Sequence, residues 1–386
     1  MRVLTTKVGA EILAKELTRR RFLNFTVAAA GVGALAACTP TSENPSAGAT
    51  GGALEDTLSL YTWAEYDDPE VLDAFTDEHG PKIVISAVNS DQEMISKLVS
   101  SRGTSGYDIV VPTGVFIPQM VENGLLAKLN HDLIPNFGNL DPAFAGRDWD
   151  PNDEYSVCKN WGSTGFVYDT TKISRELNTW SDFFDAAMNE ASGSVSLLDD
   201  PQSLCGSYFW SRGDDWTTTD TEQLDACEQF IVGELAPHVS AWDSYPVAAI
   251  ADYSHALVQV WNGEARLGIL NSADPERWQW RLGAPLTEIW MGTWAVLADA
   301  PHPEAAHAFI NYILEPEVSL QELSYIGFHT GVTGIEEAAA AEGIPMLDLI
   351  FFKQDEIDRM RTGVVNEATE RFTEIYSKAQ AAAGSA

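Results

Sequence analysis

Apolar and polar positions alternate with two different periods in the first third of the chain. One set of segments is β-branched or alternates strictly and predicts strands, and the other carries apolar residues at helical spacing. Asp68-Pro69 starts one such helix and Gly80-Pro81 follows its end, whereas Gly124 follows another. The predicted order is strand 58–63, helix 68–79, strand 82–88, helix 91–101, strand 107–111 and helix 115–123. This order predicts a doubly wound α/β lobe with parallel strands.

A similar succession follows with different spacing. The predicted strands are 165–168, 195–198, 256–261 and 290–297, and the predicted helices are 180–189, 221–233, 303–314 and 316–326. The segment 141–153 is rich in Asp and Pro and is expected to be a long loop at a boundary between lobes. About 325 residues follow the first alternation, which is enough for one large or two medium domains with a full core.

The segment that precedes Leu58 predicts export rather than a fold. Arg19, Arg20 and Arg21 come before about 16 apolar residues, which is short for a bilayer span and typical of a cleaved signal. The stretch resembles a twin-arginine signal, and Leu35-Ala36-Ala37-Cys38 resembles a lipobox. We therefore expect residues 1–37 to be a lipoprotein export signal, Cys38 to be lipidated and residues 38–56 to be a disordered tether. An uncleaved membrane anchor is the alternative, and either would place the protein outside the cytoplasmic membrane, in the periplasm or lipid-anchored at the membrane's outer face.

The formal net charge of −34 limits the class of partner. Such a charge disfavours nucleic acid and anionic membrane surfaces and favours cations. Adaptation to high salt and the ordinary acidity of an exported protein both remain open as its origin.

Neither the cysteines nor the histidines predict a metal or cofactor site. With Cys38 lipidated, Cys158, Cys205 and Cys227 remain, which permits one disulfide, Cys205–Cys227 by preference, or three reduced thiols. No CxxC, HExxH, GxSxG or P-loop motif occurs, and the seven histidines are scattered. We therefore expect no cofactor and no enzymatic activity.

Acidic or amide residues recur where predicted strands end, twice beside a tryptophan. Trp63 precedes Glu65 and Tyr66, Asp200 closely follows strand 195–198, and Trp261 is followed by an asparagine. Ligands of open α/β sheets bind outside the carboxyl ends of strands. Aromatic faces attract a desolvated organic cation by about 2 kcal/mol each, and carboxylates neutralise its charge. These residues therefore predict a site for an organic cation.

An ordered set of short motifs resembles one known family. The motifs are Trp63-Ala64-Glu65-Tyr66, Tyr107-Asp108-Ile109-Val110-Val111-Pro112, Asn139-Leu140-Asp141-Pro142, Trp161-Gly162-Ser163-Thr164, Leu198-Asp199-Asp200, Val260-Trp261-Asn262-Gly263, Ile289-Trp290-Met291, Ala308-Phe309-Ile310-Asn311 and Ile326-Gly327-Phe328. Together they resemble the extracellular solute-binding proteins, family 1-like, of polyamine (spermidine/putrescine) ABC transporters. The likeness covers nearly all of 58–380, and it rests on the order of the motifs, since no single one is specific.

The resemblance implies a two-lobed periplasmic-binding fold of type II, with a doubly wound sheet in each lobe and the ligand in the cleft. We expect lobe 1 to comprise 57–163 plus about 295–332, and lobe 2 to comprise 164–294 plus about 333–380. The implied partners are an ABC permease and its ATPase, and we expect a monomer held at the membrane by lipid alone. The implied ligand-binding residues are Trp63, Glu65, Tyr66, Asp200, Trp261 and Trp290.

Four positions depart from the family pattern. Gly292 and Ser203 stand where the family has acids that hold ammonium groups, Phe328 replaces a tyrosine, and the tyrosine expected after Pro112 is absent. A buried unpaired ammonium costs on the order of a hundredfold in affinity, so a common polyamine should bind weakly unless Glu288 or another acid substitutes. The surviving aromatics suit a ligand with fewer charges, such as a monoamine, a quaternary amine or a modified amino compound.

We therefore predict an exported receptor that binds a small cationic amine and delivers it to an ABC importer. The alternatives are the same fold with a sugar, thiamine-like or phosphonate ligand, an exported hydrolase, or a structural lipoprotein. An anionic ligand would need Arg or Lys at the matched positions, which offer none, and a hydrolase would need a nucleophile and base in proximity. The identity of the ligand stays open.

Overall fold

The computed structural model describes residues 49–101 and 105–383. The strands are β1 (Thr57–Trp63), β2 (Lys82–Val88), β3 (Ile109–Val110), β4 (Val157–Gly162), β5 (Thr164–Asp169), β6 (Val195–Leu198), β7 (Val239–Asp243), β8 (Leu257–Trp261), β9 (Trp278–Arg281), β10 (Thr287–Val296) and β11 (Met360–Thr362). The α-helices are α2 (Pro69–His79), α3 (Asp91–Ser101), α4 (Ile117–Glu122), α5 (Trp180–Met188), α6 (Pro201–Arg212), α7 (Thr221–Phe230), α8 (Val247–Ala251), α9 (Asn262–Asn271), α10 (Pro303–Ile313), α11 (Pro316–Ile326), α12 (Ile335–Ala341), α13 (Gln354–Ile357) and α14 (Ala368–Ala383).

The strands form two sheets. The first has the order β11-β10-β3-β1-β2, with β4 paired to β10, and the second has the order β7-β6-β8-β5-β9. β1 is parallel to β2 and β3, as the sequence predicts, and β10 is antiparallel to β3 and β4. Each sheet is therefore mixed, with antiparallel strands that the predicted β-α-β-α-β order did not include.

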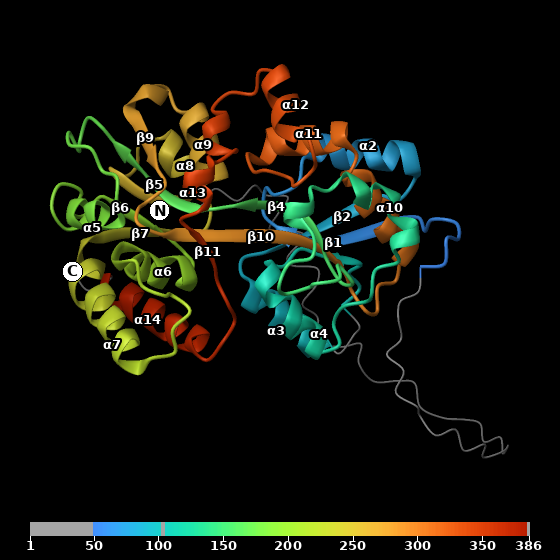
Figure 1. Ribbon diagram of the computed structural model, residues 1–386, viewed down its shortest axis with the longest axis horizontal. Coiled ribbons are helices and arrows are strands. Elements are labelled where there is room, and N and C mark those ends of the chain that lie inside the picture. The colour runs from blue at the N-terminus through green and yellow to red at the C-terminus, as the bar shows by residue number, and fades with distance from the viewer. Residues whose placement is uncertain (1–48, 102–104, 384–386) are drawn as a thin grey trace, which may run out of the picture. The chain divides into compact units, whose positions relative to one another are not determined.

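Helices cover both faces of the first sheet, as Figure 1 shows. Leu58 and Leu60 of β1 point to one face, where they pack with Phe75 of α2 and Phe309 of α10. The next residue, Tyr61, points to the other face, which α3 and α4 cover. Because successive side chains of a strand alternate in direction, the burial of both Leu60 and Tyr61 means that β1 is covered on both faces.

The second sheet is covered in the same way. Phe166 packs on one face with Phe183 of α5 and Phe372 of α14. Its neighbour Val167 packs on the other face with Ile250 of α8 and Ile269 of α9. Both layers are apolar, so each sheet has its own core.

Most boundaries of the predicted elements are confirmed, and the differences have local causes. Asp68 caps α2 by accepting a hydrogen bond from the backbone N–H of Glu70 at 2.9 Å, as its sequence indicates. The predicted strand 107–111 is paired only over Ile109–Val110, and the predicted helix 115–123 divides into a 3₁₀ turn at Gly114–Phe116 and α4. The predicted helix 221–233 ends at Phe230, where a π-helical turn at Ile231–Leu235 continues the chain.

The prediction of a tether that extends to residue 56 is wrong for residues 49–56. Glu304, in the first turn of α10, accepts hydrogen bonds from the backbone N–H groups of Thr50 at 2.5 Å and Gly51 at 3.1 Å. Glu55 accepts one from the N–H of Ala305 at 2.9 Å. The carboxylates of Glu304 and Glu55 accept hydrogen bonds from backbone N–H groups and so hold this segment on α10. The composition of the segment does not reveal these contacts. The export signal, Cys38 and residues 39–48 lie outside the described residues, and the predicted lobe boundaries stay a prediction.

The three cysteines that the structure describes are all free thiols and buried. Cys205 and Cys227 are neighbours, and burial raises the pKa of the Cys205 thiol well above its ordinary value, with Cys227 adding to the shift. The preferred Cys205–Cys227 disulfide is therefore wrong for this structure, and the reduced alternative applies. No helix in the described part of the chain has the length and apolarity needed to cross a bilayer.

A buried ion-pair triad joins β4 to two segments that lie far from it in the sequence. The Lys159 ammonium lies 2.7 Å from Asp67 and 2.9 Å from Glu322, and all three side chains are almost fully buried. Burial opposes the charge on Lys159, yet the two carboxylates together raise its pKa. The ammonium also lies 4.9 Å from the ring centre of Tyr66. The triad therefore holds β4 beside the segment that carries Tyr66.

Candidate ligand-binding site

Three carboxylates from different elements gather near the ends of the strands. Asp91 begins α3, Asp200 is the N-cap of α6, and Glu288 is the second residue of β10. Asp91 and Glu288 are buried, and Asp200 is half-buried. Each interacts electrostatically with at least one other, because Asp200 raises the pKa of both Asp91 and Glu288. We call these three residues the acid cluster.

Neutral donors hold the acid cluster in place. The backbone N–H and hydroxyl of Thr113 donate to Asp91 at 2.9 and 2.8 Å, and the N–H of Ser203 donates to Asp200 at 2.6 Å. Glu288 accepts from the hydroxyls of Thr164 and of Ser203, the latter at 3.1 Å. The indole of Trp261 also bonds Glu288. Ser203, which stands in place of a family acid, therefore supports the carboxylate of Glu288.

The acid cluster has no basic partner within the described part of the chain. None of the ion pairs there includes Asp91, Asp200 or Glu288. Burial, and then the repulsion from Asp200, raises the pKa of Asp91 to about 6 and that of Glu288 to about 7. Burial also raises the pKa of Asp200. The described residues include no group arranged to hold a metal ion. The cluster therefore suits an organic cation that donates hydrogen bonds.

One face of β10 extends from the acid cluster into an aromatic group. Glu288, Trp290 and Gly292 are alternate residues and point to the same face, so this face spans about 13 Å at 3.3 Å per residue. Phe328 packs against Trp290 with ring centres 4.9 Å apart and against Tyr66 at 6.2 Å, both edge to face. These rings offer apolar and cation–π contacts to a ligand held by the acid cluster.

Asn160 accounts for the absence of an acid at position 292. In the β10–β4 pair Gly292 lies opposite Asn160, and Trp290 lies opposite Gly162. A Cβ atom on Gly292 would lie 2.7 Å from Oδ1 of Asn160 and 3.2 Å from the hydroxyl of Tyr66. That hydroxyl donates to the same Oδ1 at 2.7 Å. The space that an aspartate would need is therefore occupied by the Tyr66–Asn160 pair.

The structure brings four of the six predicted residues to this region. Asp200, Trp261 and Trp290 lie around Glu288, and Tyr66 lies at Gly292. Trp63 ends β1 and donates from its indole to the carbonyl of Val111 at 2.8 Å. Glu65 is exposed, has a φ of 54°, and accepts a hydrogen bond from the Tyr325 hydroxyl at 3.3 Å. Burial first, and then Glu65, raises the pKa of Tyr325 to about 12. Glu65 therefore lies at the edge of the candidate site.

Sequence reasoning missed Asp91, Asn160 and Glu264, and named Glu288 only as a substitute. Glu264 is in the first turn of α9, where burial and the nearby Asp243 raise its pKa to about 8. Its Oε2 has no hydrogen-bond partner among the described residues. The sequence does contain a signal for Glu288, because it stands two residues before Trp290 and so lies on the same face of the strand. Asp91 and Asn160 carry no such signal, because partners far along the chain define their positions.

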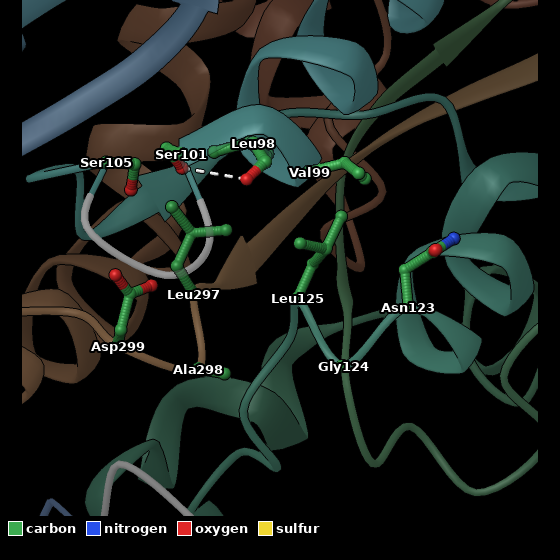
Figure 2. Close-up of a pocket in the computed structure, with 10 residues that line it drawn as sticks. All are labelled: Leu98, Val99, Ser101, Ser105, Asn123, Gly124, Leu125, Leu297, Ala298 and Asp299. Atoms are coloured by element: carbon green, nitrogen blue, oxygen red, sulfur yellow. Dashed lines mark hydrogen bonds between the residues drawn. The ribbon is translucent and has the colours of Figure 1, made fainter.

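A cavity of about 430 Å³ lies elsewhere, and Figure 2 shows its lining residues. It lies between the end of α3, the residues after α4 and the residues after β10. The cavity therefore lies at the edge of the first sheet where the parallel strands begin. Trp63, which ends β1, and Thr113, which follows β3, lie at the opposite edge. None of the predicted site residues lines it.

The comparisons with known proteins give the class of this protein. Residues 70–349 match the model of a family described as bacterial extracellular solute-binding protein, and the chain belongs to this family. It is 27% identical over 325 residues to the spermidine/putrescine-binding periplasmic protein 1 of Haemophilus influenzae, a match that covers 84% of this chain and 88% of that one. It is 30% identical over 277 residues to the spermidine/putrescine-binding periplasmic protein of Escherichia coli K12, covering 71% and 77%.

A solved structure shares the fold. The protein described as a putative spermidine/putrescine ABC transporter from Listeria monocytogenes superposes with a TM-score of 0.75 at 24% identity, covering 84% of this chain and 99% of that one. The fold is the two-lobed periplasmic-binding fold that the sequence predicted.

Proposed function

We propose that this protein is an extracytoplasmic receptor that binds a small amine in its cationic form and delivers it to an ABC importer. The observation that carries the proposal is the acid cluster, which has three carboxylates and no basic partner in the described chain. An ammonium group among them would supply the missing charge and up to three hydrogen-bond donors. The curated relatives are named for spermidine and putrescine, which supports an amine as the ligand.

The ligand-binding roles follow from this arrangement. Asp200 and Glu288 would hold the ammonium group, with Asp91 adding negative charge. Trp261, Trp290 and Tyr66 would contact the carbon chain of the ligand, and Trp63 and Glu65 would lie at the margin. Neither a reaction nor a cofactor is needed for this role. Lipidation of Cys38 after removal of residues 1–37 would keep a monomeric receptor beside its permease without a transmembrane helix.

Native mass spectrometry and an amine panel test the proposal. The purified protein should retain or take up a primary amine, with tryptophan fluorescence changing in parallel. An amine at one hundred times its Kd should stabilise the fold by about 2.7 kcal/mol. The neutral isostere 1,4-butanediol should bind far more weakly than putrescine, since it lacks the charge. If no amine shifts the melting temperature while another class of solute does, the proposal is wrong.

Binding is expected to release protons. The free protein has Glu288 at a pKa of about 7 and Glu264 at about 8, and a bound ammonium would lower the pKa of Glu288. Protons must then leave at neutral pH, so the affinity should rise about tenfold from pH 6 to pH 8 while the amine itself stays charged. Titration calorimetry in two buffers of different ionisation enthalpy counts these protons. Glu288→Gln should flatten the profile, and a flat wild-type profile would contradict the assignment.

A further inference from the structure

The far end of the site, at Gly292, offers hydrogen-bond donors instead of the acid that the family pattern places there. Nδ2 of the fully buried Asn160 has no hydrogen-bond partner among the described residues, and neither does Nε1 of Trp290. Both residues lie on the face of the β10–β4 pair that carries Gly292. The Tyr66 hydroxyl donates to Oδ1 of Asn160. The remaining polar atom of this amide is Nδ2, which can only donate.

A buried donor that lacks a partner is costly to the protein, and a ligand acceptor that paired with it would recover this cost. An ammonium group has only donors and could not pair with Nδ2 of Asn160 or Nε1 of Trp290. It would also lie beside donors that repel it. The two ends of the site therefore differ in polarity, with acceptors at the acid cluster and donors near Gly292.

We propose that the ligand is a primary amine whose other end carries a neutral hydrogen-bond acceptor, such as the carbonyl of an N-acylated diamine. The ammonium group lies at the acid cluster, the carbon chain crosses Trp290, and the carbonyl accepts from Asn160 and Trp290. The face from Glu288 to Gly292, about 13 Å long, suits a chain of this length. This inference rests on the proposed function and specifies its ligand.

The charges nearby favour a neutral carbonyl over a carboxylate at this end. Lys159 is near the ring of Tyr66, but Asp67 and Glu322 both pair with it, which leaves the triad with a net negative charge. A ligand carboxylate at this end would meet the negative charge of the triad, whereas a neutral carbonyl would not.

The test compares N-acetylputrescine, putrescine and 4-aminobutyrate by titration calorimetry on the wild-type chain and on Asn160→Asp. The wild type should bind N-acetylputrescine at least about tenfold more tightly than either other compound. Asn160→Asp keeps the acceptor for Tyr66 and replaces the donor Nδ2 with a second carboxylate oxygen. It should reverse the order of N-acetylputrescine and putrescine. Asn152→Asp, which adds the same charge at an exposed position before β4, should leave the order unchanged.

A second variant tests the steric part of the argument. Gly292→Asp alone should perturb folding or binding because of the contact with Asn160, whereas Asn160→Ala with Gly292→Asp removes that contact and should favour putrescine. Equal or tighter binding of putrescine or 4-aminobutyrate to the wild type would overturn the inference and leave the amine receptor intact. Failure of all amines to bind would overturn the proposed function itself.

Discussion

Asp200→Asn is expected to weaken amine binding on the order of a hundredfold while leaving the fold intact. Asp200 supplies negative charge to the acid cluster, and its Oδ1 caps α6 by accepting from the N–H of Ser203. Asparagine is as good an N-cap as aspartate, so helix α6 keeps its cap and loses only the charge. Removing one charged partner from a buried ion pair costs several kcal/mol, and 2.7 kcal/mol corresponds to a hundredfold change in Kd.

Asp220→Asn provides the matched control for this variant. Asp220 is the N-cap of α7 and accepts from two backbone N–H groups, but it is exposed. The same chemical change there should leave the Kd for the amine unchanged. Glu288→Gln should resemble Asp200→Asn, and the two losses should not add, because both carboxylates hold one ammonium group. Calorimetry that finds equal Kd values for Asp200→Asn and Asp220→Asn would remove Asp200 from the site.

Lys159→Met should lower the free energy of unfolding by about 3–5 kcal/mol, because it leaves Asp67 and Glu322 buried and unpaired. Chemical denaturation measures this loss. Lys128→Met is the control, since the pair between Lys128 and Glu154 is exposed and should contribute at most about 1 kcal/mol.

A triple variant separates the charge of the triad from its packing. Lys159→Met combined with Asp67→Asn and Glu322→Gln has no unpaired charge, and it should recover part of the stability lost in Lys159→Met alone. If the triple variant is less stable than the single one, the loss comes from packing and hydrogen bonds rather than from unpaired charge.

The sequence predicted β1, α2, β2 and α3 well because each has a clear period and a recognisable end. It missed β4, whose residues include Lys159 and Asn160. These polar residues suit a buried strand only because Asp67, Glu322 and Tyr66 satisfy them from elsewhere in the chain. It also missed α6 and α9, which are buried on most sides and so lack the contrast between an apolar and a polar face.

The residues of the candidate site also divide into those that local sequence patterns reveal and those that depend on distant partners. Trp63, Asp200 and Trp261 were predicted because the ends of strands are visible as local patterns. Asp91 and Asn160 reach the site through pairings with Thr113 and Gly292, which local patterns do not show. The absence of an acid at position 292 was visible in the sequence, but its physical reason, the space taken by Asn160 and Tyr66, required the fold.

Strand β10 carries residues of the candidate site and residues of the core in one short segment. Glu288, Trp290 and Gly292 face the candidate site, whereas Met291 between them packs into the core of the first sheet. The residues that follow, from Thr293 to Val296, are buried. Substitutions at positions 288, 290 and 292 are therefore expected to change which ligand the proposed receptor prefers, whereas substitutions at Met291 or in the second half of the strand are expected to lower its stability. The same alternation makes these three positions the ones to vary when the proposed receptor is engineered into a sensor.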